Sequence, residues 1–136
     1  MCFYKDIVNY SIFHKIAKED IVCYKVMTIF KIGNDGVIWV KSINYPKEEI
    51  RSYGSVMVPE IEPDLDWLDA GTLVLQSGVI HSYTHLPNTV ILNGRYVGQS
   101  VIVKCRIPKG TPYWQNNRDG VYASTKLILD GIVNSN

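Results

Sequence analysis

Polar, aromatic and basic side chains flank the clearest strand pattern in the sequence, Ser100 to Ile107. This segment runs into a corner, Pro108 to Pro112, that cannot continue a strand because proline lacks the amide donor. Aromatic rings can stack on planar groups, hydroxyls and amides can form hydrogen bonds, and arginine or lysine can pair with anions. The candidate ligand-binding residues of these types are Ser82, Tyr83, Thr84, Asn93, Arg106, Lys109, Tyr113 and Trp114. In a second interpretation, Tyr113 and Trp114 are core residues that fill the space beneath the corner.

Common catalytic and metal-binding motifs do not occur in the sequence, which lacks G-x-S-x-G, G-x-x-x-x-G-K and H-E-x-x-H. His81 and His85 are four residues apart, but the chain there predicts strand and turn rather than a zinc-binding helix. The carboxylates between Glu60 and Asp69 alternate as for a hard cation, but no glycine stands where a calcium loop turns. A solvated acidic loop is the preferred interpretation of that run, and we expect no metal and no cofactor.

Composition narrows the class of protein. At 136 residues the chain is long enough for one domain, and we expect residues 1–136 to form it. The share of hydrophobic residues is 46% and that of charged residues 20%, which is typical of a soluble globular protein and not of a disordered one. A net charge of +1 argues against a nucleic-acid polymer as partner. No apolar run approaches the ~18 residues of a membrane span, so we expect no membrane partner.

Three cysteines, Cys2, Cys23 and Cys105, occur without C-x-x-C spacing. An odd count without a signal peptide indicates a reducing compartment, and we expect a cytoplasmic location. Cys23 and Cys105 lie in apolar strand patterns, where a free thiol behaves as a small hydrophobic side chain.

Local patterns predict the elements that position these residues. Ile21 to Phe30 is an almost continuous apolar run in which Lys25 is the only charge, which favours a strand covered on both faces. Asn34-Asp-Gly36 predicts a tight turn that pairs this strand with Val37 to Ile43. Apolar spacing predicts a helix over Ser11 to Glu19, and Pro46 to Arg51 predicts one helical turn.

The remaining segments complete a β-dominated fold. We expect residues 1–10 to be a docking arm and residues 133–136 a frayed tail. Asn93-Gly94 predicts a hairpin turn between Thr89 to Leu92 and Tyr96-Val97. Further strands are expected at Ser55 to Val58, Thr72 to Gln76, Ser100 to Ile107 and Val121 to Leu129. The sum is an α+β fold of about seven or eight mostly antiparallel strands with one or two short helices.

The order of four elements resembles that of ADP-ribosyltransferase-type domains. They are Tyr24-Lys25 on a strand, then Ser82-Tyr83-Thr84, then the corner Ile107 to Thr111, and a last strand ending Lys126 to Leu129. In that family the corresponding elements are an aromatic residue followed by Arg, a Ser-Thr-Ser strand, a similar corner, and a strand with the catalytic Glu. The resemblance implies an ADP-ribose-type ligand.

Two departures from the family pattern bear on activity. Lys25 stands in the place of the family's Arg, and Val121 to Thr125 contains no acidic residue. Without a carboxylate, nothing steadies the positive charge that develops on the ribose as nicotinamide leaves. The departures therefore imply binding without transfer.

Cys105 to Tyr113 reads C-x-I-P-K-G-T-x-Y and is followed by Ala123-Ser124, which is similar to small phage and prophage proteins. Non-catalytic phage proteins that hold nucleotides, among them Thoeris anti-defence proteins, act as sponges for immune signals. Together the resemblances imply a protein of the host cytoplasm that sequesters a cyclic nucleotide or ADP-ribose-type signal. The high apolar and Tyr content and an N-terminal arm with no clear internal place predict a homo-oligomer. Two alternatives stay open: an ADP-ribosyltransferase-like enzyme that uses an acid such as Glu60 or Glu62, and a structural or interaction protein without a small ligand.

Overall fold

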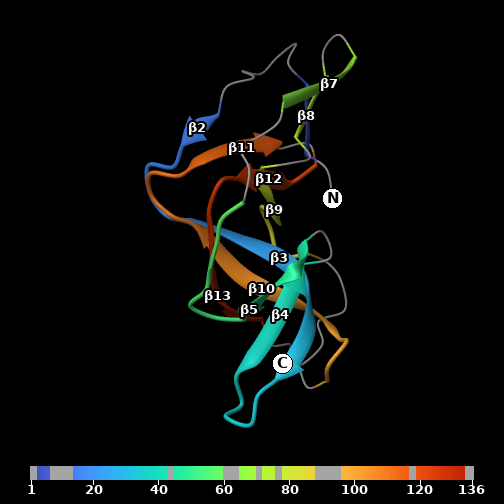
Figure 1. Ribbon diagram of the computed structural model, residues 1–136. Helices are drawn as coiled ribbons and strands as arrows, with labels where there is room; N and C mark the ends of the chain where they lie inside the picture. The colour runs from blue at the N-terminus through green and yellow to red at the C-terminus, as the bar shows by residue number, and fades with distance from the viewer. Residues whose placement is uncertain are drawn as a thin grey trace.

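The computed structural model describes residues 3–6, 14–42, 45–59, 65–69, 72–75, 78–87, 96–116 and 119–133. These residues form thirteen strands and no helix, and every strand pair is antiparallel (Figure 1). A three-stranded sheet has the order β1 (Phe3–Asp6), β8 (Thr72–Leu75), β7 (Leu65–Asp69). A ten-stranded sheet contains the rest of the described strands.

The large sheet is organised around β3 (Ile21–Ile32) and β10 (Ser100–Ile107), which pair along the whole of β10. Its main path runs β2 (Lys15–Ile16), β11 (Pro112–Asn116), β12 (Val121–Ser124), β9 (Ile80–Tyr83), β3, β10, β13 (Leu127–Ile132), β6 (Val56–Met57). The far end of β3 also pairs with β4 (Ile38–Ser42), which pairs with β5 (Tyr45–Arg51). In Figure 1 the β3–β4 hairpin extends away from the small sheet.

The predicted α+β class with one or two short helices is wrong, because the described residues contain thirteen strands and no helix. Within Ser11 to Glu19, residues 14–19 are described, and Lys15–Ile16 form a strand that pairs with β11. The expected helical turn at Pro46 lies inside β5, whose described pairing is with β4 alone. Proline fits such an edge strand because no sheet partner needs its missing amide donor.

The hairpin at Asp35-Gly36 is confirmed. β3 and β4 pair from Thr28↔Lys41 to Ile32↔Ile38 around the turn. Gly36 has φ 82°, a conformation that costs glycine little, and Asp35 Oδ1 accepts a hydrogen bond from the Val37 amide at 3.0 Å. The local turn chemistry therefore sets the register of these two strands.

β3 buries one face, not the two that the apolar run predicts. Cys23, Met27 and Ile29 are buried at 0 to 1% exposure, whereas Val22 is 48% exposed on the opposite face. Strand side chains alternate between faces, so one row of β3 joins the main core and the other row faces outward. That core also contains Val101, Val103, Cys105 and Ile107 of β10, Val40 of β4, and Leu127 and Leu129 of β13.

Other segment boundaries differ from expectation. The strands expected at Ser55 to Val58, Thr72 to Gln76 and Ser100 to Ile107 are present as β6, β8 and β10. The expected closing strand from Val121 to Leu129 is two strands, β12 and β13, that pair with different neighbours. Leu65–Asp69, expected as loop, is β7, β11 was not expected as a strand, and Tyr96-Val97 lie in a turn and bend.

Several expectations fall partly or wholly outside the described residues. Of the docking arm, Phe3–Asp6 pair with β8, so this part has a partner within the chain. Val133 donates its amide to Ile102 O at 2.8 Å, whereas residues 134–136 are not described. The turn at Asn93-Gly94 and the strand at Thr89 to Leu92 also lie outside the described residues. Within the described residues, no helix has the length and apolar character to cross a membrane.

Candidate functional site

The Pro-Gly corner is pinned against the segment that precedes β3. After β10 the chain turns at Pro108, whose carbonyl accepts the Thr111 amide at 3.1 Å, and Gly110 takes φ 87°. The Ala17 amide donates to Thr111 O at 3.0 Å, and the Gly110 amide donates to Ala17 O at 2.8 Å. These two bonds place the corner beside residues 15–20, far from it in sequence.

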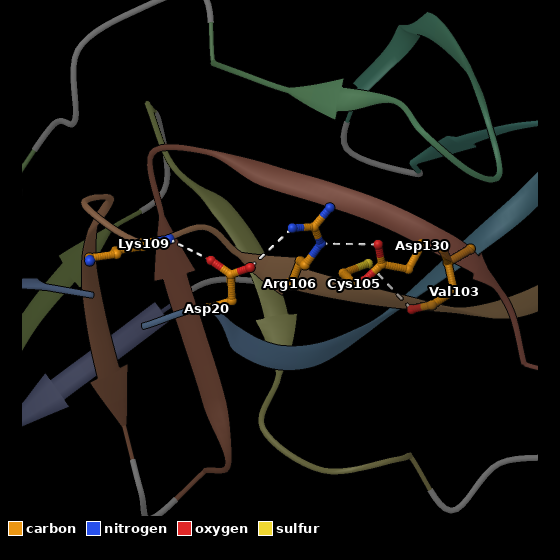
Figure 2. A network of polar contacts seen from close by, with 6 residues as sticks. All are labelled: Asp20, Val103, Cys105, Arg106, Lys109 and Asp130. Atoms are coloured by element: carbon orange, nitrogen blue, oxygen red, sulfur yellow. Dashed lines mark hydrogen bonds and ion pairs between the residues drawn. The ribbon is translucent and has the colours of Figure 1, made fainter. Parts of the chain in front are cut away.

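Asp20 ties the corner to the sheet. Figure 2 shows its carboxylate between Lys109 and Arg106. Oδ1 accepts the Lys109 amide at 2.8 Å, and Oδ2 accepts Arg106 Nη1 at 3.0 Å. Arg106 Nε in turn donates to Asp130 Oδ1 at 3.1 Å, so one guanidinium joins carboxylates from two segments. The network holds the start of β3, the end of β10 and β13 in register.

This arrangement favours the charged form of both partners. The Lys109 amide, and then Arg106, hold the pKa of Asp20 below its ordinary value of 3.8. Hydrogen bonds from Arg106 to Asp130 and then Asp20 raise the pKa of the guanidinium. The side chain of Arg106 is 39% exposed and that of Asp20 is 47% exposed, so water screens the attraction between their charges. The ion pair therefore contributes little energy, and its main effect is to fix the positions of the segments that it joins.

A depression open to solvent, which we call the corner depression, lies beside this network and has a volume of about 1070 Å³. Its lining is Lys15, Ile16, Ala17, Lys18, Glu19, Asp20, Ile21 and Tyr113. Lys15 and Lys18 are exposed, and Tyr113 is half-buried with its ring edge-on to Tyr122 at a centroid distance of 5.9 Å. One aromatic ring and two ammonium groups thus line the same hollow, a combination that suits a phosphorylated planar ligand.

The predicted ligand-binding residues divide between different places. Tyr113 lines the corner depression, and Lys109 extends from the adjoining corner with an exposed side chain. Arg106 is near Asp20 but is already paired with two carboxylates. Asn93 lies outside the described residues.

The β9 candidates and Trp114 lie elsewhere in the sheet. Ser82, Tyr83 and Thr84 are not among the residues that line the corner depression, and β12 lies between β9 and β11. Trp114 is 5% exposed, packs with Val79, Val121 and Ala123, and has its ring 5.4 Å from that of His14. Tyr83 is half-buried against the same cluster, and the Thr84 amide donates to Gly120 O at 2.9 Å.

Lys25 is buried in the main core at 6% exposure. Its Nζ donates to His81 O at 2.8 Å, and burial lowers the pKa of the amine to about 8. Cys23 lies on the same face of β3, and burial raises the pKa of its thiol to about 11. Ser82 and Ser124 are fully buried, and Ser124 Oγ has no hydrogen-bond partner among the described residues. These polar groups lie inside the core, away from solvent and from the corner depression.

Sequence reasoning missed the residues that line the depression. Lys15 and Lys18 lie within the segment predicted as a helix, and no sequence pattern points to Asp20. Asp20 contacts residues 86 and 89 positions away, and no local pattern reports such contacts. The buried Lys25 did leave a signal, since it is the only charge in an apolar run.

No protein-family model, no curated protein and no solved structure matches this chain. The resemblances to ADP-ribosyltransferase-type domains and to small phage proteins therefore stay predictions. Among the described residues, no group of three or more His, Cys, Asp or Glu side chains is placed to hold a metal ion.

Proposed function

We propose that this protein binds and sequesters a small phosphorylated nucleotide, of the cyclic-nucleotide or ADP-ribose class, in the corner depression. The observation that carries the proposal is the half-buried ring of Tyr113 in one hollow with the exposed ammonium groups of Lys15 and Lys18. The ring offers a stacking surface to a base, and the two cations attract a phosphate group. Lys109, on the adjoining corner, adds a third cation near the rim.

The hydrogen bonds behind the depression favour binding because they fix its wall in advance. Asp20 holds the corner through the Lys109 amide, and Ala17 holds it through Gly110 and Thr111. A ligand that enters a wall already fixed by hydrogen bonds does not have to order it, and this lowers the entropy cost of binding. In this proposal Arg106 positions Asp20 and does not itself meet the phosphate.

Sequestration fits the carboxylates of the site better than group transfer does. Two acidic residues, Glu19 and Asp20, line the depression. Asp20 already accepts hydrogen bonds from the Lys109 amide and from Arg106, so its negative charge stabilises the corner. Glu19 is exposed, where water weakens the field that an acid needs to stabilise a developing cation. We therefore propose that the ligand leaves chemically unchanged.

A screen with a defined nucleotide panel tests the proposal. Thermal unfolding is followed with a cyclic mononucleotide, a cyclic dinucleotide, cyclic ADP-ribose, ADP-ribose and NAD. We expect at least one to raise the unfolding midpoint, and mass spectrometry after denaturation to recover it intact. Failure of all five to shift the midpoint contradicts binding, and release of nicotinamide from NAD favours the enzyme alternative.

A second candidate function, a protein interaction module, is favoured by the outer face of the large sheet. The register places Val22, Arg106, Ile128 and Val56 in one row across β3, β10, β13 and β6. Val22 is 48% exposed and Val56 is 53% exposed, so apolar area faces solvent at both ends of this row. We propose that copies of the chain associate into a homo-oligomer in the host cytoplasm, which light scattering at micromolar concentration tests.

A further inference from the structure

Cys23 and Cys105 are partner residues on the two central strands of the large sheet. In the register of β3 and β10, the Cα of Cys23 lies opposite that of Cys105. Directly opposed residues of antiparallel strands point to the same face, and both thiols are buried at 0% exposure. Both cysteines are free.

This pairing meets the distance requirement for a disulfide. Opposed residues have Cα atoms about 4.5 to 5.5 Å apart, and disulfides span Cα separations of about 4.4 to 6.8 Å. The next residues on the same face of the opposite strand are two positions along it. They lie diagonally across from Cys23, at a separation of about 7 to 8 Å, which is beyond that range. The register therefore singles out Cys105 as the residue that Cys23 can bond without moving either strand.

The thiols are also held close to other groups in the core. Cys105 Sγ donates to Val103 O at 3.3 Å, as Figure 2 shows. Burial raises the pKa of both thiols, and the charge of Lys25, two residues from Cys23 on the same face of β3, opposes that rise only in part. A thiolate is the form that attacks a disulfide.

We propose that Cys23 and Cys105 form a cross-strand disulfide when the protein meets a small-molecule disulfide such as oxidised glutathione. Because both thiols are buried, the attack takes place when the strands open locally and expose one of them as a thiolate. That thiolate attacks oxidised glutathione, which gives a mixed disulfide and releases one reduced glutathione. The second cysteine attacks the mixed disulfide, forms the Cys23–Cys105 bond and releases the second reduced glutathione. Both protein thiol protons and two electrons pass to the glutathione sulfurs, so the exchange is balanced.

The bond joins the strands next to the corner. Cys23 follows Asp20 by three residues, and Cys105 precedes the corner residue Pro108 by three. A covalent link here holds β3 to β10 at the end where Asp20 meets Lys109 and Arg106. The inference stands on the strand register and does not depend on nucleotide binding.

Redox titration of the full chain tests it. The Cys2→Ser variant removes the third thiol and is equilibrated with mixtures of reduced and oxidised glutathione under native conditions. After acid quenching, the intact mass is expected to fall by two hydrogens, and after alkylation peptide mapping is expected to find Cys23 linked to Cys105. The unfolding midpoint of the oxidised protein is expected to rise, because the link restricts the unfolded chain.

A register-shifted variant is the matched control. Val103 is buried at 0% exposure, two residues from Cys105 on the same face of β10. In Cys2→Ser/Val103→Cys/Cys105→Ser, the two remaining cysteines are diagonal, and we expect no intramolecular link there. The proposal is overturned if the folded Cys2→Ser variant shows only glutathione adducts or unmodified thiols across the titration. It is equally overturned if the control links as readily as the opposed pair, or if the link lowers the unfolding midpoint.

Discussion

Replacing Lys25 by Met should stabilise the protein at neutral pH. Burial lowers the pKa of this amine from 10.5 to about 8, and each tenfold change in proton affinity corresponds to about 1.4 kcal/mol. The charged amine therefore costs the folded state about 3 kcal/mol at pH 7. Removing the hydrogen bond to His81 O costs about 1 to 2 kcal/mol in the other direction. The net expectation at pH 7 is a gain of about 1 to 2 kcal/mol for Lys25→Met.

The sign of the pH dependence follows from the lowered pKa. Below pH 8 the amine is charged in both states, and the folded protein bears the full cost. Between pH 8 and 10.5 the unfolded chain keeps the proton while the folded protein loses it, so folded stability rises with pH. Above 10.5 the cost is gone, and the wild type is then the more stable protein by the value of its hydrogen bond.

Urea unfolding of both proteins at pH 7 and pH 10 measures this difference. Titration of the other residues occurs in both proteins and cancels in the difference between them. Lys104→Met is the matched control, because Lys104 is exposed on the opposite face of β10 and its replacement should give the same difference at both pH values. A Lys25→Met difference that does not change with pH, or a large loss of stability at pH 7, would refute the reasoning.

Three further predictions concern other parts of the fold. Asp20→Asn should lower the urea midpoint more at pH 7 than at pH 3, because the lowered pKa of Asp20 gives stability that is lost as pH falls from 3.8 through the pKa of the folded state. Ser124→Ala should leave stability unchanged or raise it by about 1 kcal/mol in urea unfolding, because its buried Oγ has no described partner, and a loss above that size would reveal one. Gly36→Ala should cost about 1 kcal/mol in the same assay, since φ 82° disfavours a Cβ, whereas an unchanged midpoint would mean that the turn relaxes.

The parts of the fold that the sequence predicted are those with local causes. Asp35-Gly36 determines its own turn, and the alternation within Ser100 to Ile107 marks a strand whose bounds agree with β10. The helix predicted across Ser11 to Glu19 rested on a few apolar positions. Lys15 and Ile16 instead pair with Tyr113 and Pro112, a choice made by a partner strand far along the chain. Propensity yields to such pairing because the ladder satisfies the backbone hydrogen bonds.

The sequence predicted the corner beside the candidate site but not the residues that line the corner depression. The sequence drew attention to Pro108 to Pro112 and to Tyr113, because proline and glycine mark a corner that an aromatic follows. It did not reveal that Asp20 and Lys15 meet that corner, since residues 15–20 reach it only through long-range hydrogen bonds. Ser82 and Trp114, chosen by residue type, are buried, and exposure cannot be read from type alone.

Isothermal titration of the nucleotide that shifts the unfolding midpoint most is the direct test of binding in the corner depression. We predict saturable binding that Tyr113→Leu and Lys15→Gln/Lys18→Gln each weaken by about 1 to 3 kcal/mol, the usual scale for a lost stacking or charge-assisted contact. Lys126→Gln, which removes an exposed lysine outside the depression, and Tyr96→Leu, which removes a ring that is 66% exposed, should bind as the wild type does. Equal affinity in all four variants, or no heat of binding in the wild type, would contradict the account.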